Sequence, residues 1–312
     1  MEIAELRPLP DCLQKVAIEE LNEVPERVPE DIETLKTWIK QQPHLRARTD
    51  DQFLLAFLRG CKFSLEKAKY KIDNYYTLRT KYPEFFTMSN VDDADVLELI
   101  RLGIGLYLPK PLYGNGSRII FVRTGAYPAN KFNFADVMRL AYAMQELVML
   151  KDDYANINGI IDILDMSQLS AAHMFQLTPT VMKKMFVYIE DAVPLRQKST
   201  HIINTPVGFE PLYNTLKPLM PAKQQARLFV HGNKMNALYE HIPQEYLPIE
   251  YGGNNGSLKE LTEETEKKFL EFKEFFLESL QFGVDENLRP NKSIDYDTVF
   301  GVEGSFRKLN VD

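Results

Sequence analysis

The sequence predicts an α/β protein in which a helical N-terminal part precedes a mixed, mostly parallel sheet flanked by helices. Residues 1–95 carry apolar side chains at helical spacing, whereas residues 96–256 alternate short apolar runs with helical segments. Such alternation is typical of parallel strands joined by helical crossovers. A final part, residues 257–312, begins with a helix and continues as a turn-rich tail. We therefore expect three parts with these boundaries.

Three helices are expected in the N-terminal part. Residues 31–40 place their apolar side chains on one face, and Pro43 ends this helix. Residues 49–52, with the sequence Thr-Asp-Asp-Gln, have the form of a capping box for a second helix. Ser64 is expected to cap a third helix that runs toward Pro83. Together these helices form a small helical module.

Short apolar runs in the middle part predict the strands of the sheet. Residues 104–108 and 119–122 flank a turn-rich segment in which Asn115-Gly116 suits a tight hairpin. Beyond this hairpin, helices and strands alternate. We expect a helix at 134–150, a strand at 159–164, a helix at 179–189, a strand at 201–203, a helix at 209–219 and a strand at 228–230.

The last part of the chain starts with a second capping-box pattern at Ser257–Glu260. It precedes a helix whose apolar face runs from Leu261 to Leu280. After Gly283 the composition is mixed and turn-rich, so we expect an extended tail that wraps the surface.

Composition and charge limit the class of function. The chain is 45% apolar and 26% charged, which is ordinary for a globular protein. No cationic leader and no run of ~18 apolar residues is visible, so a cytoplasmic protein is expected. Its two cysteines are too few for a disulfide framework. The formal charge of −7 argues against nucleic acid as a partner, because neutralisation of phosphates drives that binding.

One segment of this acidic chain is basic. Between residues 196 and 234 the only acid is Glu210. The bases there are Arg196, Lys198, Lys217, Lys223, Arg227 and Lys234. This segment is therefore a candidate for contact with an anionic surface, although a solvated basic face would have the same composition.

No motif of an enzyme or of a cofactor site is present. Neither a nucleotide-binding glycine pattern nor a nucleophile elbow occurs. The five histidines are scattered without the i, i+4 spacing of a helical zinc site, so no metal is expected. Asp162 and Asp165 suggest an acid/base pair, but side chains three residues apart in a strand point to opposite faces. We therefore expect no catalytic residues and no cofactor.

Four segments of the chain, in order, resemble the CRAL-TRIO family, which includes tocopherol, retinaldehyde and phosphatidylinositol carriers. They are Asp51–Arg59 with Lys62-Phe63, Gly159–Ser167, Asp191–Phe209 and Leu247–Gly253. The resemblance covers about residues 31–280 and is nearest to the tocopherol and retinaldehyde carriers.

This resemblance implies a cavity for one hydrophobic molecule as cargo, with the sheet as its floor and residues 209–219 as a mobile lid helix. The candidate ligand-binding residues are Met138, Ala141, Tyr142, Gln145, Ile160, Leu164, Phe175, Met185, Tyr188, Ile189, Val193, Ile203, Phe209, Leu212, Tyr213 and Leu216. Among them, Tyr142, Gln145 and Tyr188 are expected to select the ligand by their polar groups. The same apolar residues would also suit an ordinary protein core.

The resemblance further implies that a basic cleft beside the lid receives phosphoinositide headgroups. Lys198, Lys223 and Arg227 fall at matching places, and the N-terminal cations Lys67, Lys69 and Lys71 are possible additions. We expect a monomeric carrier that associates transiently with anionic membranes. Two alternatives stay open: a regulatory or adaptor protein that uses the same fold, and an enzyme that works through Asp162 or Asp165.

Overall fold

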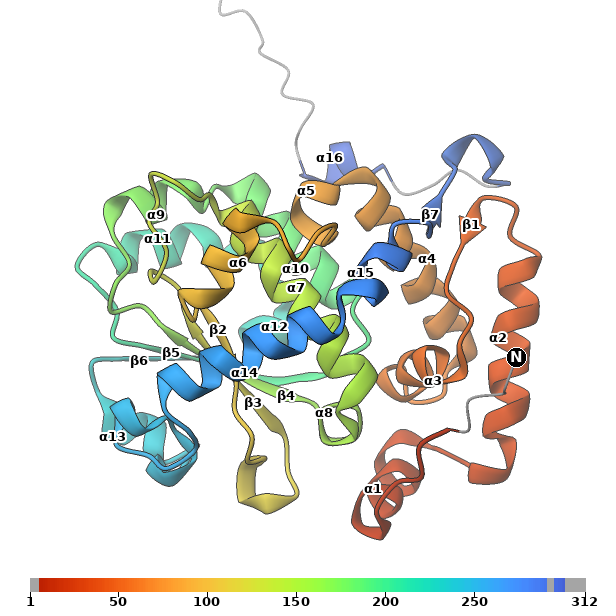
Figure 1. Cartoon of the computed structure of the whole chain (residues 1–312), viewed down its shortest axis with the longest axis horizontal. Helices are drawn as coiled ribbons and strands as arrows, with labels where there is room; N and C mark the ends of the chain where they lie inside the picture. Colours follow the sequence, from red (N-terminus) through yellow and green to blue (C-terminus); the bar gives the residue numbers. More distant parts are fainter. Residues whose placement is uncertain (1–5, 291–294, 301–312) are drawn as a thin grey trace, which may run out of the picture.

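A computed structural model describes residues 6–290 and 295–300 of the chain. It confirms the predicted α/β class, with a five-stranded sheet, helices on both of its faces and a helical N-terminal part (Figure 1). The N-terminal helices lie to one side of the sheet, and the final helices return toward them (Figure 1).

The N-terminal part contains the three predicted helices and several that the sequence pattern missed. The predicted ones are α2 (Val28–Lys40), α3 (Asp51–Gly60) and α4 (Leu65–Lys81). The others are α1 (Asp11–Leu21), a 3-10 turn at Pro25–Arg27, α5 (Pro83–Phe86) and α6 (Ala94–Arg101). The α3 side chains from Phe53 to Arg59 are all buried, so this helix lies at the centre of the module.

Two capping predictions in this part are wrong in detail. The N-cap of α3 is Asp50 rather than Thr49, and its side chain accepts no capping hydrogen bond. Ser64 is the N-cap of α4 as predicted, but its hydroxyl makes no capping bond either. Burial of the apolar faces, rather than the caps, therefore holds these helices in place.

The sheet has the strand order β2-β3-β4-β5-β6. Strand β2 (Gly105–Tyr107) is antiparallel to β3 (Arg118–Arg123), and the remaining neighbours are parallel. The later strands are β4 (Ile160–Asp165), β5 (Gln197–Ile203) and β6 (Leu228–Gly232). The predicted mixed, mostly parallel sheet is thus confirmed, with β4 at its centre.

The predicted tight hairpin turn at Asn115-Gly116 is wrong. The link between β2 and β3 contains a 3-10 turn at Leu112–Gly114, and the positive φ angles lie at Tyr113 (54°) and Gly114 (80°). Asn115 instead has φ −137°. The left-handed residues that reverse the chain therefore precede the Asn-Gly step, and the loop is longer than a two-residue turn.

Helical crossovers join the parallel strands, as expected. They are α7 (Phe134–Lys151) with α8 (Asp153–Asn158), α9 (Ala171–Gln176) with α10 (Pro179–Asp191), and α11 (Phe209–Leu216), a 3-10 turn (Lys217–Leu219) and α12 (Ala222–Gln225). After β6 come α13 (Met235–Tyr239), two 3-10 turns (Gln244–Tyr246 and Ile249–Tyr251), α14 (Leu258–Glu271) and α15 (Lys273–Ser279). The predicted capping box at Ser257 is confirmed.

The two faces of the sheet belong to different hydrophobic clusters. On the inner face, Ile120 and Ile160 pack with side chains of α7 and α10. On the outer face, Ile161 and Ile163 pack with Leu238 and other residues of the segment after β6. The inner face is the side of the sheet that carries Ile160, Asp162 and Leu164 of β4.

The segment after Gly283 is more ordered than the extended tail that the sequence predicts. Strand β7 (Gly283–Val284) pairs with β1 (Leu45–Arg46), and a 3-10 turn (Glu286–Leu288) and α16 (Tyr296–Phe300) follow. We call residues 283–290 and 295–300 the C-terminal strap. The remainder of the predicted tail, residues 291–294 and 301–312, lies outside the described residues.

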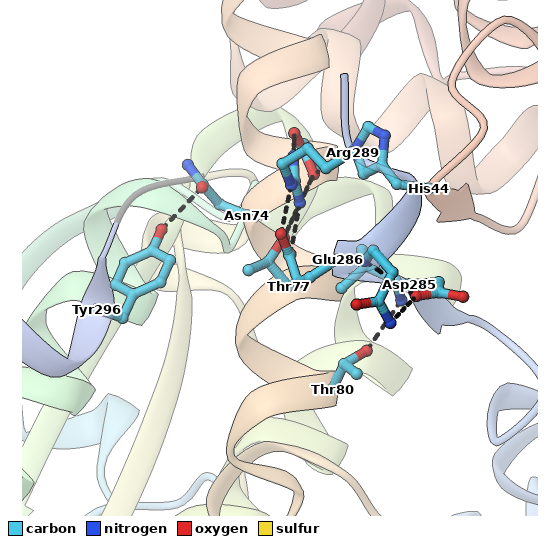
Figure 2. A network of polar contacts seen from close by, with 11 residues as sticks. His44, Asn74, Thr77, Thr80, Asp285, Glu286, Arg289 and Tyr296 are labelled. Carbon is cyan, nitrogen blue, oxygen red and sulfur yellow. Dashed lines mark hydrogen bonds and ion pairs between the residues drawn. The ribbon is translucent and has the colours of Figure 1, made fainter. Parts of the chain in front are cut away.

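Polar contacts fasten this strap to α4 (Figure 2). Arg289 donates to Asp73 and Thr77 at 2.9 Å each. The hydroxyl of Tyr296 donates to Asn74 Oδ1 at 2.8 Å. Tyr296 is 2% exposed, so its ring also closes the core at this end.

Candidate functional site

The inner face of the sheet is not completely filled by the helices that cover it. Strand β4 is central, so its side chains on this face are expected to be fully buried. Ile160 is 3% exposed, but Asp162 and Leu164 of the same face are only half-buried. Thr200 on β5, the register partner of Asp162, is also half-buried. Space therefore remains beside the central strand at these positions.

Asp162 is a half-buried acid on this face. Its carboxylate accepts a hydrogen bond from Gln197 Nε2, and the same nitrogen donates to Thr200 Oγ1 at 2.8 Å. Burial raises the pKa of Asp162 to about 6, and the bond from Gln197 opposes this shift. The carboxylate is therefore mostly ionised at neutral pH and lies in an apolar setting between Ile160 and Leu164.

Helix α7 carries two polar side chains among the predicted ligand-binding residues, Tyr142 and Gln145. Burial raises the pKa of Tyr142 well above its ordinary value, and the neighbouring Tyr188 and the charge of Asp162 add to the shift. Gln145 follows Tyr142 by one helical turn. Its Oε1 is buried and has no hydrogen-bond partner among the described residues. An unpaired buried amide oxygen is costly, so Gln145 carries a local energetic penalty.

Tyr188 on α10 is held in an aromatic cluster. Its ring stacks on Phe86 with centroids 4.1 Å apart and planes 5° apart, and Tyr142 lies 4.5 Å away. Burial raises the pKa of Tyr188, so its hydroxyl stays protonated.

Helix α11, the predicted lid, lies against the sheet. Phe209 and Tyr213 belong to the cluster of Leu164, Ile202 and Leu228 on the sheet. Leu212 and Leu216 pack instead toward Met182 and Phe186 of α10. Helix α11 thus bridges the sheet and α10 through two rows of side chains.

Most of the predicted ligand-binding residues lie on elements that cover the inner face of the sheet, although Ile189 also lines the basic cleft between the N-terminal module and the sheet. Met138, Ala141, Tyr142 and Gln145 lie on α7, Ile160 and Leu164 on the inner face of β4, Met185, Tyr188 and Ile189 on α10, Val193 just after it, and Phe209, Leu212, Tyr213 and Leu216 on α11. Two others lie elsewhere. Ile203 packs on the outer face with Leu238, because its position in β5 has the opposite parity to Ile202. Phe175 on α9 is 83% exposed.

Apolar side chains are exposed where α9 meets the loop before α11. Phe175 is 83% exposed and Val207 is fully exposed, at 100%. A Cβ placed on Gly208 would lie 3.9 Å from Met174 Cε, so this loop passes close to α9. Figure 1 shows α9 and α11 side by side. The exposed patch therefore borders the start of the predicted lid.

A second site is a cleft of about 530 Å³ between the N-terminal module and the sheet. Lys198, Lys223 and Arg227, the three predicted cations, all line it. It also contains bases that the prediction did not include or left uncertain, which are Lys62, Lys67, Lys71 and Arg196. The acids of its lining are Glu20, Glu190 and Asp191. Of the possible N-terminal additions, Lys69 does not line the cleft and pairs with Glu66 at 2.7 Å.

The cations of this cleft are crowded. Burial lowers the pKa of Lys198, and the charges of Arg196 and Arg227 lower it further. Arg196 Nε is buried without a hydrogen-bond partner among the described residues. Acids of the cleft neutralise these charges only in part. Lys223 Nζ lies 3.1 Å from Glu190 Oε1, whereas Lys198 Nζ lies 3.9 Å from Glu20 Oε2. An anion placed here would relieve this repulsion.

The carboxylates that suggested an enzyme lie on opposite faces of β4, as their spacing predicted. Asp165 accepts hydrogen bonds from the backbone N–H and the hydroxyl of Ser167, both at 3.0 Å, and from Asn204 Nδ2 at 2.9 Å. It therefore stabilises the turn after the strand, while Asp162 lies on the inner face.

Three histidines meet on the outer face, which the sequence pattern did not indicate. His201 Nδ1 and His231 Nε2 are 2.9 Å apart, and the ring of His241 is 5.2 Å from that of His201. Burial lowers the pKa of His201 to about 4, and His231 and His241 add to the shift. Within residues 6–290 and 295–300, no group of three His, Cys, Asp or Glu side chains is arranged to hold a metal ion.

No helix of the described part of the chain has the length and apolar character needed to cross a membrane.

Comparison with known proteins agrees with this geometry. Residues 24–96 match the Pinta-like UBA domain family, and residues 114–253 match the CRAL/TRIO domain family. The alpha-tocopherol transfer protein-like protein of Mus musculus is 30% identical over 251 residues, which cover 80% of this chain and 72% of that protein. Clavesin-1 of Rattus norvegicus is 31% identical over 246 residues, covering 78% and 68% respectively.

The fold has a counterpart among solved structures as well. The crystal structure of Sfh5 superposes with a TM-score of 0.50 and 13% sequence identity, covering 86% of this chain and 99% of that one. At this identity the likeness concerns the fold alone. Taken with the sequence relatives and the matched residues, it leads to one conclusion: the chain belongs to the CRAL/TRIO domain family.

Proposed function

We propose that the protein is a cytoplasmic carrier that encloses one small hydrophobic molecule, such as a retinoid or tocopherol, and exchanges it at phosphoinositide-containing membranes. The observation that carries this proposal is the incompletely filled inner face beside Asp162 and Leu164, at the centre of the sheet and under α11. The bound molecule is cargo, and the proposal includes no cofactor and no catalytic step.

Solvation explains why such a space would hold an apolar guest. Transfer of apolar surface out of water gains about 25 cal/mol per Å², so a ligand of several hundred Å² gains several kcal/mol. The carrier must compete with a bilayer rather than with water, so it needs a route that keeps the ligand out of the aqueous phase. A lid that opens only against a membrane supplies such a route.

Helix α11 and the exposed patch beside it support this role for the lid. Phe175 and Val207 are exposed next to the start of α11, where they would enter the lipid interface first. Gly208, at the N-cap of α11, has φ 90°, a left-handed conformation that glycine adopts without strain. The lid would thus move about Gly208 with its apolar rows turning toward the lipid.

The basic cleft supports docking at a phosphoinositide. Each Lys or Arg near an anionic leaflet contributes about 1 kcal/mol, and the cleft brings together bases of α4, β5 and α12. A headgroup with several phosphates would reduce the repulsion around Lys198. The N-terminal module would then take part in membrane recognition through Lys67 and Lys71.

Solvent extraction and native mass spectrometry of the purified chain test the carrier proposal. We expect one hydrophobic molecule per chain, either co-purified or taken up from vesicles. A chain that holds no lipid after purification and takes none up from vesicles would contradict the proposal and favour an adaptor that keeps the fold.

Vesicle sedimentation tests the docking proposal separately. The double variant Lys223→Glu with Arg227→Glu should bind phosphatidylcholine vesicles containing phosphatidylinositol bisphosphate about tenfold or more weakly, from ~1 kcal/mol per cation. Ligand retention in solution should be unchanged. Lys259→Glu on α14 is the matched control, because this exposed lysine lies outside the cleft. Equal sedimentation of all three chains would show that the cleft does not dock the protein.

A further inference from the structure

Helix α1 contributes one acid to the basic cleft. Glu20 lines the cleft, and its Oε2 lies 3.9 Å from Lys198 Nζ. The two other acids of the lining, Glu190 and Asp191, belong to α10. Among the described residues, Glu20 is thus the only acid that the N-terminal part of the chain contributes to this lining.

Neighbouring contacts hold the end of α1, and with it Glu20, in place. Leu21 is completely buried and packs with Ile157 of α8. Glu23 pairs with Arg59 of α3 at 2.9 Å, and both side chains are buried. A negative charge in the last turn of a helix opposes the helix dipole, so Glu20 does not lie there for the stability of α1. Its position is better explained by the cations that it meets in the cleft.

Glu20 is a counter-charge for two of these cations. Burial lowers the pKa of Lys198 and of Arg196, whereas the carboxylate of Glu20 raises the pKa of both. The 3.9 Å between Glu20 and Lys198 is longer than a hydrogen bond, and the two side chains are 55% and 39% exposed. Such an exposed ion pair is weak, so a phosphate group can replace the carboxylate at little cost.

We infer that Glu20 is a built-in competitor of the phosphate groups that the cleft binds. This inference rests on the proposed docking function and deepens it, because it names a residue that regulates the same site. Without a bound anion, Glu20 reduces the repulsion between Lys198 and Arg196. An arriving phosphate must take the place of Glu20 beside Lys198, so the affinity is lower than the cations alone would give. A carrier that exchanges cargo must also leave the membrane, and the competing acid shortens its stay there.

Vesicle sedimentation of single-charge variants tests the inference. We expect Glu20→Gln to bind phosphatidylcholine vesicles containing phosphatidylinositol bisphosphate about fivefold more tightly than the wild type, from the loss of one repelling charge. Glu20→Lys should gain about a further fivefold. Glu19→Gln is the matched control, because this exposed neighbour lies 3.9 Å from Lys15 and does not line the cleft. It should bind as the wild type does, and equal gains for the two glutamine variants would overturn the inference.

The soluble headgroup separates the cleft from the membrane surface. Inositol trisphosphate carries the phosphates of the same lipid without a bilayer, and calorimetry measures its binding. Glu20→Gln should strengthen this binding by a similar factor, whereas a gain on vesicles alone would place the effect at the membrane surface and overturn the inference. Equal affinities of the wild type and Glu20→Gln for both probes would also overturn it, while leaving docking standing. A wild type that binds neither probe would instead remove the docking proposal and the competitor with it.

Discussion

The buried ion pair between Arg79 and Glu146 joins the N-terminal module to the sheet domain, and breaking it should be severe. Arg79 lies on α4 and Glu146 on α7, and their side chains are 6% and 4% exposed. Tyr75 also donates to Glu146, whose other oxygen is buried without a partner among the described residues. Burial raises the pKa of Glu146, while the charge of Arg79 lowers it.

Arg79→Met removes the cation and leaves a buried carboxylate. Loss of one partner of such a pair costs about 3–5 kcal/mol, whereas replacement of both by apolar residues of similar volume is often neutral. We therefore expect Arg79→Met and Glu146→Leu each to lower the free energy of unfolding by about 3–5 kcal/mol. The double variant should recover most of that loss.

Urea unfolding measures the free energy of unfolding of the wild type, the two single variants and the double variant. Trp38 on α2 is the only tryptophan, so its fluorescence reports the N-terminal module, and circular dichroism reports the whole chain. If the double variant lost the sum of the two single losses, the reasoning would be wrong. That result would mean that the two side chains stabilise the fold through separate contacts rather than through each other.

Three further predictions concern the site and its surroundings. Leu164→Trp should lower the ligand stoichiometry in native mass spectra because the indole fills the space beside β4, and an unchanged stoichiometry would argue against space there. Phe175→Asp should weaken binding to phosphatidylcholine vesicles about 10- to 100-fold, from the ~1.5–3 kcal/mol for burial of an exposed phenylalanine, whereas Leu270→Asp on α14 should not. His201 has its pKa lowered to about 4, so its stabilising effect is present above pH 6.5 and is lost as the pH falls toward 4. Between pH 7 and pH 5, protonation linked to His201 lowers the free energy of unfolding by about 2 kcal/mol. The Tm of His201→Asn should therefore fall less over that range than the Tm of the wild type. Equal falls would show that His201 is not the group responsible.

Local patterns were sufficient for most of the fold. The strands at Ile160–Asp165 and Leu228–Gly232 are short apolar runs between helical segments, and helix α7 shows a clear helical period. The errors in capping and in the hairpin turn occur where a sequence pattern fits two structures. Thr49 and Asp50 are both acceptable N-caps, and the Asn115-Gly116 step resembles a hairpin turn although Tyr113 and Gly114 reverse the chain.

The site depends more on contacts between distant residues. Lys198 and Arg227 were predictable within one basic segment, but Lys62 reaches the cleft only because α3 and α4 pack beside β5. The hydrogen bond from Gln197 to Asp162 and the meeting of His201 with His231 arise from strand pairing, and no local pattern contains that register. Partial exposure at the centre of a sheet is likewise a property of packing alone.

The C-terminal strap has a consequence for the order in which the molecule is completed. Helix α4 is synthesised early, yet Arg289 and Tyr296, which contact Asp73 and Asn74 from the strap, follow more than two hundred residues later (Figure 2). Strand β1 likewise pairs with β7, which is synthesised much later. During translation the N-terminal module must therefore leave the ribosome with open edges, and only the last described turns seal it.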